Sequence, residues 1–332
     1  MKIGLIGAGR IGAFHAQTLA SQADITELRI ADVDVDRAKS VAESTGASTA
    51  TDADELVRWA DAIVIAASTD THADLITLGA EAGLPVFCEK PITLDLETTN
   101  RVLERVNTAD IPLQIGFQRR FDPGFTAARD MLASGQLGRL YMAKLNTYDP
   151  EPAHDAYIKV SGGMFVDMLV HDFDLIRWVS GQEVVEVTAA GRALTGNPAF
   201  EQADDVDTAV AVLQLADGAM AVVSGVRHDP RGYDVRLEMH GSRDAVAAGI
   251  NAQMPLKLLD DNDQWENGNE HQTFLERFES SYRQELNTFL KVAQGQMDSP
   301  CTGEDAGEAL RLALVAKKSL RERRPVLVEE IR

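Results

Sequence analysis

An otherwise apolar segment of the chain carries ionisable side chains at helical spacing. Asp167, His171 and Asp174 stand at positions i, i+4 and i+7, so a helix would place them on one stripe, directly after the pair Gly162-Gly163. A histidine with a pKa of about 6.5 suits a general base at neutral pH, and a nearby carboxylate can fix its tautomer and orientation. Two interpretations stay open. The stripe is the solvent-facing side of an amphipathic helix, or it is a base with its orienting group.

A metal site is a third interpretation of this segment, through His171, Asp172 and Asp174. Adjacent and alternate residues of a helix point in different directions and do not converge on one ion. The two cysteines, Cys88 and Cys301, are far apart and show no metal-ligand spacing. We therefore rank the metal interpretation low and predict no metal.

The next candidate is Lys90, which stands between Glu89 and Pro91 at the end of an apolar run. Such a run is typical of a buried strand, and a lysine at its end is rarely there for packing alone. Its ammonium can donate hydrogen bonds to a substrate hydroxyl. The alternative is that Lys90 extends to solvent or pairs with Glu89. Cys88 is expected to be a core residue rather than a nucleophile.

The N-terminus carries the pattern of a phosphate-binding turn. The run Gly7-Ala8-Gly9-Arg10-Ile11-Gly12 lies between an apolar run and a helix-like stretch. Gly7 allows a sharp turn, Gly9 lets the backbone approach a pyrophosphate, and Gly12 lets helix and strand pack closely. A second apolar run ends in Asp32, 20 residues after Gly12, where a ribose-binding carboxylate is expected. A tight turn without a ligand is the remaining structural interpretation.

A scaffold of secondary structure must position these residues. Up to about residue 120, apolar runs alternate with helix-like segments, which predicts a doubly wound, largely parallel α/β sheet. The expected strands are Ile3–Gly7, Leu28–Asp32, Ser48–Ala50, Ala62–Ala67, Val86–Glu89 and Leu113–Phe117. Ligands of such sheets lie beyond the carboxyl ends of the strands. Three of these ends carry polar groups, which are Ser68-Thr69 with His72, Glu89-Lys90, and Gln118-Arg119-Arg120.

Beyond Leu140 the pattern predicts an α+β unit, with an open, mainly antiparallel sheet covered by helices on one face. The expected strands are Leu140–Asn146, Val184–Ala190, Val206–Leu215, Ala219–Val226 and Val235–His240, with a hairpin turn at Asp217-Gly218. The expected helices are Phe125–Ala133, Gly163–Val179, Tyr282–Ala293 and Glu304–Arg321. The acidic stretch Leu258–Gln272 is expected to be a solvated surface loop. The sequence thus predicts two domains, 1–120 and 121–332.

The composition excludes several function classes. A formal net charge of −20 over 332 residues would repel nucleic acid and anionic membrane surfaces. The longest apolar stretch, Ala62–Ala67, is far shorter than the roughly 20 residues of a membrane span, and no signal-peptide pattern opens the chain. Two cysteines far apart suit a reducing compartment. We therefore expect a cytoplasmic protein with a small-molecule substrate and no nucleic-acid or membrane partner.

The motifs together resemble one family. GAGRIG, Glu89-Lys90-Pro91, Thr69-x-x-His72 and Gly162-Gly163-x3-Asp167-x3-His171 are similar to the glucose–fructose oxidoreductase, inositol dehydrogenase and rhizopine catabolism (Gfo/Idh/MocA) family over nearly the whole chain. The segments 116–122 and 232–234 are most similar to the bacterial inositol 2-dehydrogenases. The resemblance implies an NAD-binding Rossmann domain at 1–120 and a substrate-binding and oligomerisation domain at 121–332. It also implies a homotetramer or homodimer.

The resemblance further implies roles for single residues. His171 would take the proton from the reacting hydroxyl, Asp167 would orient it, and Lys90 would anchor the hydroxyl beside the nicotinamide, so that a ring alcohol becomes a ketone. The residues implied in cofactor binding are Gly7, Gly9, Arg10, Ile11, Gly12, Asp32, Val33, Ser68, Thr69, His72, Glu89, Lys90 and Gln118. The residues implied in substrate binding are Lys90, Arg119, Asp149, Asp167, His171 and Tyr233. A cis bond between Lys90 and Pro91 is expected.

The substrate stays open within this resemblance. Gln118 stands where the family has a hydrophobic residue, so another inositol isomer or a pyranose sugar is an alternative to myo-inositol. The cofactor is expected to be NAD, since Asp32 would repel the 2′-phosphate of NADP and Val33 offers no donor to offset that. An enzyme that recycles a permanently bound nicotinamide is a further alternative. A nucleotide-sensing regulator ranks lowest, because it has no need of the full catalytic set.

Overall fold

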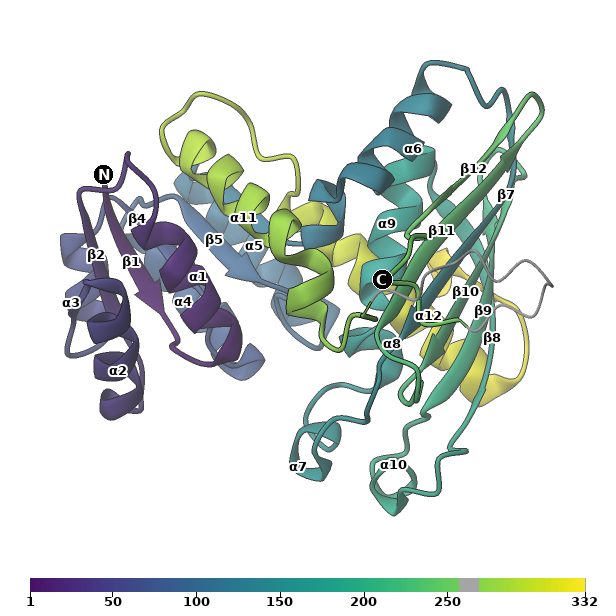
Figure 1. The fold of residues 1–332 in the computed structure, drawn as a ribbon, viewed down its shortest axis with the longest axis horizontal. Helices are drawn as coiled ribbons and strands as arrows, with labels where there is room; N and C mark the ends of the chain where they lie inside the picture. Colours follow the sequence, from purple (N-terminus) through teal and green to yellow (C-terminus); the bar gives the residue numbers. More distant parts are fainter. Residues whose placement is uncertain (257–268, 332) are drawn as a thin grey trace. The chain divides into compact units, whose positions relative to one another are not determined.

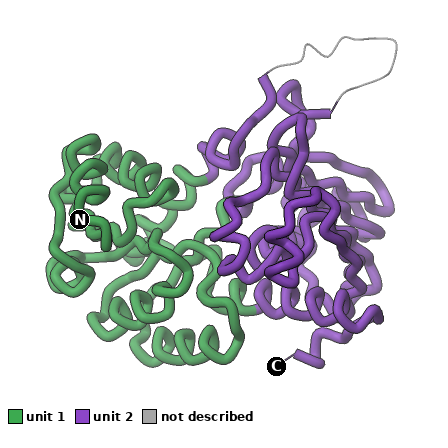
Figure 2. The backbone as a smooth tube through the Cα atoms, turned by 90° about the horizontal axis from the view of Figure 1, so that it is seen from below, with its two compact units in different colours: residues 1–118, 282–307 green, residues 119–281, 308–332 purple. Residues whose placement is uncertain are grey.

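A computed structural model describes residues 1–256 and 269–331 of the chain (Figure 1). They form two compact units, which Figure 2 shows in different colours. Unit 1 contains Met1–Gln118 and Tyr282–Gly307, and unit 2 contains Arg119–Ser281 and Glu308–Arg332. Most of the acidic stretch expected to be a surface loop lies outside the described residues. Within the described ranges, no helix is long and apolar enough to cross a lipid bilayer.

Unit 1 is built on a parallel six-stranded sheet with the strand order β3-β2-β1-β4-β5-β6. Its strands are β1 (Lys2–Ile6), β2 (Glu27–Ala31), β3 (Ser48–Thr49), β4 (Ala62–Ile65), β5 (Val86–Glu89) and β6 (Leu113–Gly116). Strand β1 pairs in parallel with β2 on one side and with β4 on the other. The strand order reverses there, which is the point where such sheets bind ligands. The predicted doubly wound sheet is confirmed.

The helices of unit 1 begin where side chains accept hydrogen bonds from their first N–H groups, with two exceptions. They are α1 (Arg10–Ala20), α2 (Val35–Thr45), α3 (Ala53–Trp59), α4 (Thr69–Glu81) and α5 (Leu96–Ala109). Asp34, Asp52 and Asp95 cap α2, α3 and α5. No side-chain hydrogen bond caps α1 or α4, the helices that follow β1 and β4. An anionic ligand can take the place of such a cap.

The chain returns to unit 1 late in the sequence, through α11 (Phe274–Ala293). Leu286, Phe289 and Leu290 of this helix pack in the hydrophobic core beside the parallel sheet. The expectation that residues 121–332 form one domain therefore needs correction, because residues 282–307 belong with residues 1–118. The sequence pattern shows this helix, but periodicity does not reveal which core its apolar face covers.

Unit 2 is built on a seven-stranded sheet with the order β12-β11-β7-β10-β9-β8-β13. Its strands are β7 (Leu140–Tyr148), β8 (Val184–Arg192), β9 (Thr208–Leu215), β10 (Met220–Val226), β11 (Asp234–Gly241), β12 (Ala245–Ala248) and β13 (Val326–Leu327). Strands β7 and β10 pair in parallel and the other neighbours are antiparallel, which confirms the mainly antiparallel prediction. The hairpin at Asp217-Gly218 joins β9 to β10 as expected. Strands β12 and β13 are too short to show an alternating pattern.

Helices cover one face of this sheet, where α6 and α9 lie against it (Figure 1). The helices not yet named are α6 (Pro123–Ala133), α7 (Asp155–Ile158), α8 (Met164–Asp167), α9 (Val170–Ser180), α10 (Pro198–Gln202) and α12 (Gly303–Glu322), with 3-10 turns η1 (Gln118–Phe121) and η2 (Val328–Glu330). Burial alternates along the strands, so Ala209 and Ala211 of β9 are buried while Val210 is exposed. The opposite face of the sheet therefore presents side chains such as Val210.

Candidate active site

The turn between β1 and α1 has the geometry of a phosphate-binding loop. Gly7 lies at φ +100°, and a Cβ there would be 2.5 Å from the backbone of Ala66, just past β4. A Cβ at Gly12 would be 2.1 Å from the carbonyl oxygen of Gly7, so glycine is needed for α1 to pack this closely. Nothing lies within 4 Å of a Cβ built on Gly9. The turn thus leaves room for a ligand beside the helix N-terminus.

Asp32 lies beside this turn, directly after β2. Its Oδ2 accepts a hydrogen bond from the N–H of Ala8 at 2.6 Å, and its Oδ1 accepts one from the N–H of Asp34 at 2.8 Å. The neighbouring Val33 side chain is fully exposed. Asp32 also lines a hollow near the end of β3. The structure therefore places Asp32 beside the glycine turn, as expected from the 20-residue spacing between Gly12 and Asp32.

The segment after β5 is held by a buried histidine. The peptide bond between Lys90 and Pro91 is cis, as predicted. The carbonyl oxygen of Pro91 lies 2.8 Å from His72 Nδ1, and that of Ala67 lies 3.2 Å from His72 Nε2. Burial lowers the pKa of His72. The imidazole therefore links the backbone after β4 to the backbone after β5, next to Lys90.

The other residues expected to bind the cofactor lie at the same edge of the parallel sheet. Arg10 and Ile11 form the first turn of α1 after β1. Ser68-Thr69 opens α4 after β4, Glu89 is the last residue of β5, and Gln118 opens η1 after β6. Because the carboxyl ends of parallel strands share one edge, the fold gathers these residues there.

In unit 2, the single helix expected over 163–179 is interrupted. Gly162 and Gly163 have φ of +83° and +87°, α8 ends at Asp167, and α9 begins only at Val170. Asp167 and His171 therefore lie on different helices. The i, i+4 spacing does not show this break, because the apolar residues between them are compatible with an unbroken helix.

The interpretation of the Asp167, His171 and Asp174 stripe as a solvent face is wrong. These side chains retain 8%, 9% and 1% of their exposure. A charged residue is rarely buried to this degree unless it has a partner. The buried location therefore favours a specific role for each of the three.

Asp172 and Asp174 belong to two buried ion pairs. Arg120 donates from Nε and Nη2 to the two oxygens of Asp174, at 2.8 and 2.5 Å. Arg119 donates from Nη1 to Asp172 Oδ1 at 2.9 Å. Because different arginines hold the two carboxylates, they do not converge on one ion with His171.

Arg119, an expected substrate residue, is buried beside Tyr233. Burial alone would lower the pKa of Arg119, but the ion pair with Asp172 and a hydrogen bond with Tyr233 outweigh it and raise that pKa. Burial raises the pKa of Tyr233. Thr147 Oγ1 donates to Asp172 at 2.8 Å. The structure thus brings Arg119 and Tyr233 together, and adds two residues that the sequence analysis did not assign to this group.

Asp167 lies in a second set of paired side chains, which we call the Arg227 group and which comprises Asp149, Tyr157, Asp167 and Arg227. Asp167 and Arg227 are buried, whereas Asp149 is partly buried and Tyr157 is exposed. Asp167 accepts hydrogen bonds from Tyr157 Oη at 2.8 Å and from Arg227 Nη2 at 2.7 Å. Arg227 Nη1 donates to Asp149 Oδ2 at 3.1 Å. Burial would lower the pKa of Arg227, but the two carboxylates raise it. Burial raises the pKa of Asp149, although Arg227 opposes this.

Two members of this group are candidates that the sequence analysis missed. Arg227 directly follows β10 and Asp149 directly follows β7, and these are the two parallel strands of the sheet. The rule that ligands gather at the carboxyl ends of parallel strands could have found Arg227. Tyr157 lies in the short helix α7, within a stretch that has no clear periodicity. We find no sequence signal that marks it.

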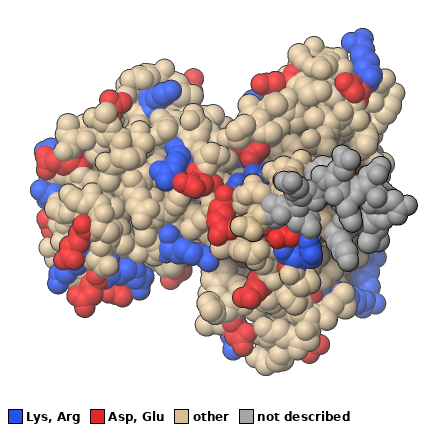
Figure 3. All heavy atoms as spheres, in the orientation of Figure 1, with Lys and Arg blue, Asp and Glu red and all other residues tan. Residues whose placement is uncertain are grey.

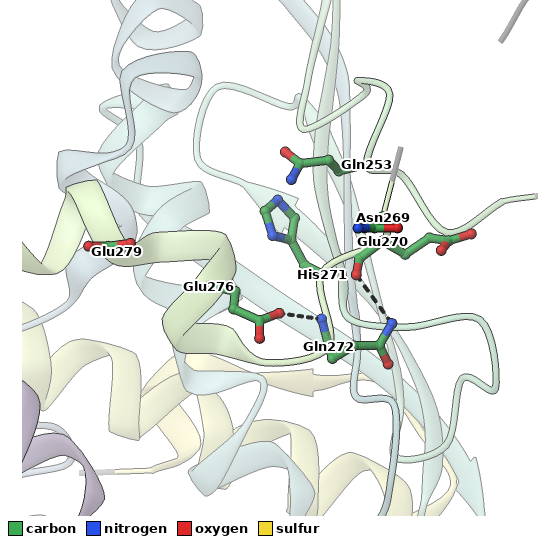
Figure 4. A pocket seen from close by; sticks show the side chains of 7 residues that line it. All are labelled: Gln253, Asn269, Glu270, His271, Gln272, Glu276 and Glu279. Carbon is green, nitrogen blue, oxygen red and sulfur yellow. Dashed lines mark hydrogen bonds between the residues drawn. The ribbon is translucent and has the colours of Figure 1, made fainter. Parts of the chain in front are cut away.

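A hollow elsewhere in unit 2 contains none of the expected site residues (Figure 4). It is lined by Gln253, Asn269, Glu270, His271, Gln272, Glu276 and Glu279. Glu276 accepts a hydrogen bond from the N–H of Gln272 at 2.7 Å, and burial lowers the pKa of His271. The backbone oxygen of His271 accepts from the N–H of Tyr233. The hollow thus adjoins Tyr233 through this backbone hydrogen bond.

The described side chains on the face in Figure 3 do not form an extended basic surface. Nucleic-acid binding needs such a surface. The formal net charge is −20, and on the face shown in Figure 3 the basic side chains are interspersed with acidic ones. What is described of this face therefore favours a small ligand over an anionic macromolecule.

Comparison with known proteins matches both units. Residues 1–117 match a family model described as "Oxidoreductase family, NAD-binding Rossmann fold", and residues 125–247 match the "GFO/IDH/MocA C-terminal domain". Myo-inositol 2-dehydrogenase of Thermotoga maritima is 39% identical over 100% of this chain and 99% of its own length. Inositol 2-dehydrogenase of Rhizobium meliloti is 38% identical over 99% of both chains. The crystal structure of scyllo-inositol dehydrogenase from Lactobacillus casei with bound NAD(H) and scyllo-inositol has a TM-score of 0.88 at 27% identity, over 99% of both chains.

Proposed function

The chain belongs to the GFO/IDH/MocA family of NAD-binding oxidoreductases, and on that premise we propose that it oxidises a ring hydroxyl of a cyclic polyol to a ketone. Myo-inositol, oxidised at carbon 2, is the first candidate substrate, since a relative of that name matches the whole chain. One observation carries the proposal. Asp167 and His171 are both buried and follow Gly162-Gly163 in the sequence, and Arg227 donates a hydrogen bond to the Asp167 carboxylate.

The N-terminal domain binds NAD, which supplies the hydride acceptor when bound. The glycine turn fits its pyrophosphate, because Gly9 leaves open space and no side chain caps α1. Asp32, next to the turn, suits the adenosine ribose. The residues proposed to contact NAD are Gly7, Gly9, Arg10, Ile11, Gly12, Asp32, Val33, Ser68, Thr69, His72, Glu89, Lys90 and Gln118.

The catalytic residues in this proposal are Lys90, Asp167 and His171. A ring nitrogen of His171 accepts the proton of the reacting hydroxyl, and the Lys90 ammonium donates a hydrogen bond to the hydroxyl oxygen. Asp167 stabilises the imidazolium that forms. Arg227 and Tyr157 both donate hydrogen bonds to Asp167, which keeps its carboxylate ionised for this task.

Arg119, Asp149 and Tyr233 are proposed to hold the remaining hydroxyls of the substrate. Asp149 offers acceptor oxygens, Tyr233 offers a hydroxyl, and Nε of Arg119 is a buried donor without a partner in the described part of the chain. A site with fixed donors and acceptors distinguishes isomers that differ only in the direction of one hydroxyl. The same residues that bind the polyol would therefore also select it.

A second candidate substrate is another inositol isomer or a pyranose sugar. Gln118 departs from the hydrophobic residue that the family resemblance predicts, and it is buried at the end of β6. The similar Lactobacillus casei structure holds scyllo-inositol. A polar side chain at this position can change which ring hydroxyls are preferred.

The proposal is tested by a screen of inositol isomers and pyranose sugars, in which the absorbance of reduced nicotinamide is measured for each substrate. We expect the highest kcat/KM with myo-inositol. A clearly higher value with scyllo-inositol or a sugar would support the second candidate. If no cyclic polyol or sugar reduces NAD, a nucleotide-sensing role becomes the better explanation.

We propose a homotetramer or homodimer formed through the open face of the unit 2 sheet. The register places Val222 of β10 beside Val212 of β9, and Met220 and Val210 lie on the same face with exposures of 48% and 42%. Exposed apolar side chains in such a row mark an interface. Light scattering should give the mass of an oligomer, and Val210→Lys should lower it. A wild-type mass of one chain would contradict this assembly.

We also propose a cytoplasmic location. Cys88 and Cys301 are both buried and neither forms a disulfide, and burial raises the pKa of the Cys88 thiol. Free thiols are typical of a reducing compartment. Cell fractionation with an antibody against the protein tests this, and recovery outside the cytoplasmic fraction would contradict it.

A further inference from the structure

Unit 1 buries three ionisable side chains that the proposed reaction does not use as a set. They are His15 on α1, Glu89 at the end of β5 and Glu285 on α11, and we call them the His15 group. One ring nitrogen or carboxylate oxygen from each lies within 4.8 Å of those from the other two. His15 and Glu285 are fully buried. The three side chains come from elements that are far apart in the sequence, so no sequence pattern relates them.

Glu89 is held in this group from two sides. His15 Nε2 lies 2.6 Å from Glu89 Oε1. A Cβ built on Gly116 of β6 would be 2.9 Å from Glu89 Oε2, so the missing side chain at Gly116 makes room for the carboxylate. The Glu89 side chain keeps 12% of its exposure. It is thus fixed in orientation while still reachable by a ligand.

The surroundings of His15 determine where its proton lies. Nδ1 has no hydrogen-bond partner among the described residues. The rings of Phe14, Phe87 and Tyr282 surround the imidazole, with centroids 6.3, 5.6 and 6.1 Å away. A proton on Nδ1 would therefore be buried without an acceptor. The favoured tautomer is neutral and donates from Nε2 to Glu89, so His15 supplies no positive charge to the group.

Glu285 is the member without a donor. Both of its carboxylate oxygens are buried and lack a hydrogen-bond partner in the described part of the chain, although its backbone oxygen accepts from Gln114 Nε2 at 2.9 Å. Burial raises the pKa of Glu285 well above its usual range, and the nearby Glu89 raises it further. An ionised carboxylate here would face a second carboxylate in a site from which water is excluded.

We propose that Glu285 is a neutral carboxylic acid at physiological pH, so that the single negative charge of the His15 group stays on Glu89, directly before Lys90. Glu285 is then a positioning residue for NAD, acting through Glu89. This role rests on the proposed contact between Glu89 and NAD. The protonated state of Glu285 itself does not depend on that contact.

A metal ion is the competing way to neutralise two buried carboxylates. A metal-bound histidine usually donates its other ring N–H to an acceptor, and His15 Nδ1 has none among the described residues. The 2.6 Å separation of His15 Nε2 and Glu89 Oε1 is that of a direct hydrogen bond. The geometry therefore favours a proton over a metal.

Infrared spectroscopy tests the protonated state directly. The wild-type protein at neutral pH should show the C=O stretch of a protonated carboxylic acid, and Glu285→Gln should remove it. Glu81→Gln, a change at an exposed glutamate of the same unit, should leave that band in place. Absence of the band in the wild type, or its survival in Glu285→Gln, would overturn the proposal.

Two charge variants at residue 285 separate the proton from a cation. Glu285→Gln keeps a neutral group, so the dissociation constant for NAD should stay within about threefold of wild type. Glu285→Lys introduces an ammonium that would pair with Glu89 and withdraw it, so that constant should rise about tenfold or more. A bound cation predicts the reverse order. The reverse order, or stoichiometric metal in the purified protein, would overturn the proposal.

Both measurements are independent of polyol oxidation. If no polyol is oxidised, the proposed substrate fails while the infrared band and the NAD affinities remain measurable. If the band is present but Glu285→Lys binds NAD as tightly as Glu285→Gln, the positioning role fails and the protonated state stands. Circular dichroism of each variant shows whether it is folded.

Discussion

The two buried groups of carboxylates differ in what neutralises them. In the Arg227 group of unit 2, one guanidinium donates to both Asp149 and Asp167. In the His15 group of unit 1, Glu89 faces a histidine nitrogen and Glu285 has no donor among the described residues. A carboxylate with a cationic donor keeps its charge and can stabilise an imidazolium, whereas one without a donor favours the protonated form. The surroundings, and not the residue type, set the charge of each acid.

The largest expected effect is that of replacing His171, the proposed base, whose orienting carboxylate Asp167 belongs to the Arg227 group. His171→Ala should lower kcat by roughly 10²- to 10⁴-fold, the usual contribution of a positioned general base. The NAD dissociation constant should stay within about threefold, because His171 lies outside the NAD-binding domain. Asp167→Asn and Lys90→Ala should lower turnover in the same direction. Steady-state kinetics and NAD titration measure both quantities, and turnover equal to the parent's would remove His171 from the mechanism.

Removing Arg227 from the Arg227 group and Glu285 from the His15 group should have different effects on stability. Arg227→Met should reduce the free energy of unfolding by about 3–5 kcal/mol, because two buried carboxylates lose their cation. Glu285→Leu should not reduce it at neutral pH, since no hydrogen bond of its carboxyl group is lost and the free energy of protonating this buried acid above its unfolded pKa is no longer required. Urea unfolding followed by fluorescence measures both.

The matched control for this pair is Arg105→Met. Arg105 pairs with Glu81 at the surface of unit 1, so its loss should lower the free energy of unfolding by less than about 1 kcal/mol. Losses of similar size for Arg227→Met and Arg105→Met would show that the buried pair is no more important than a surface pair.

A third carboxylate, Asp32, accepts hydrogen bonds from two backbone N–H groups, and its Oδ1 lies 3.7 Å from Nη1 of Arg37. Its negative charge should repel the 2′-phosphate of NADP. We expect kcat/KM to be about 10- to 1000-fold higher with NAD than with NADP, and Asp32→Ala should narrow this ratio. Comparable values for the two cofactors with the wild-type protein would contradict this role of Asp32.

The last expected effect is the pH dependence of stability. The pKa of Glu285 is raised in the folded chain, so its contribution is complete below the unfolded pKa of about 4.5 and is lost as the pH rises through the folded pKa. The advantage of wild type over Glu285→Gln should therefore shrink by up to about 1.4 kcal/mol per pH unit in that window. Urea unfolding at a series of pH values measures this. A constant difference would argue that Glu285 is ionised throughout.

The parts of the site that could be predicted from the sequence depend on local signals. The glycine turn and Asp32 belong to one strand-turn-helix-strand unit, so their spacing places both at the same edge of the sheet. The same holds for the end of β5, where the cis bond before Pro91 is found. In these places the neighbours in space are near neighbours in the sequence.

The parts that could not be predicted depend on contacts between distant residues. His15 and Glu89 are 74 residues apart, and Arg227 and Asp167 are 60 apart. Helical spacing left open whether the stripe that contains Asp167 faces solvent or orients a base, because a pattern of polar residues does not distinguish water from a buried arginine as its partner. Such pairs become visible only when the sheet topology is known.

The return of residues 282–307 to the parallel-sheet unit has a consequence for how this chain is made. A ribosome completes residues 1–118 long before Leu286, Phe289 and Leu290 exist, so the nascent first unit has an apolar core that is still uncovered on one side. Contacts between residues this far apart also form slowly, because a long loop must close first. The NAD-binding unit is therefore the first to begin synthesis, yet it cannot be completed until most of unit 2 has left the ribosome.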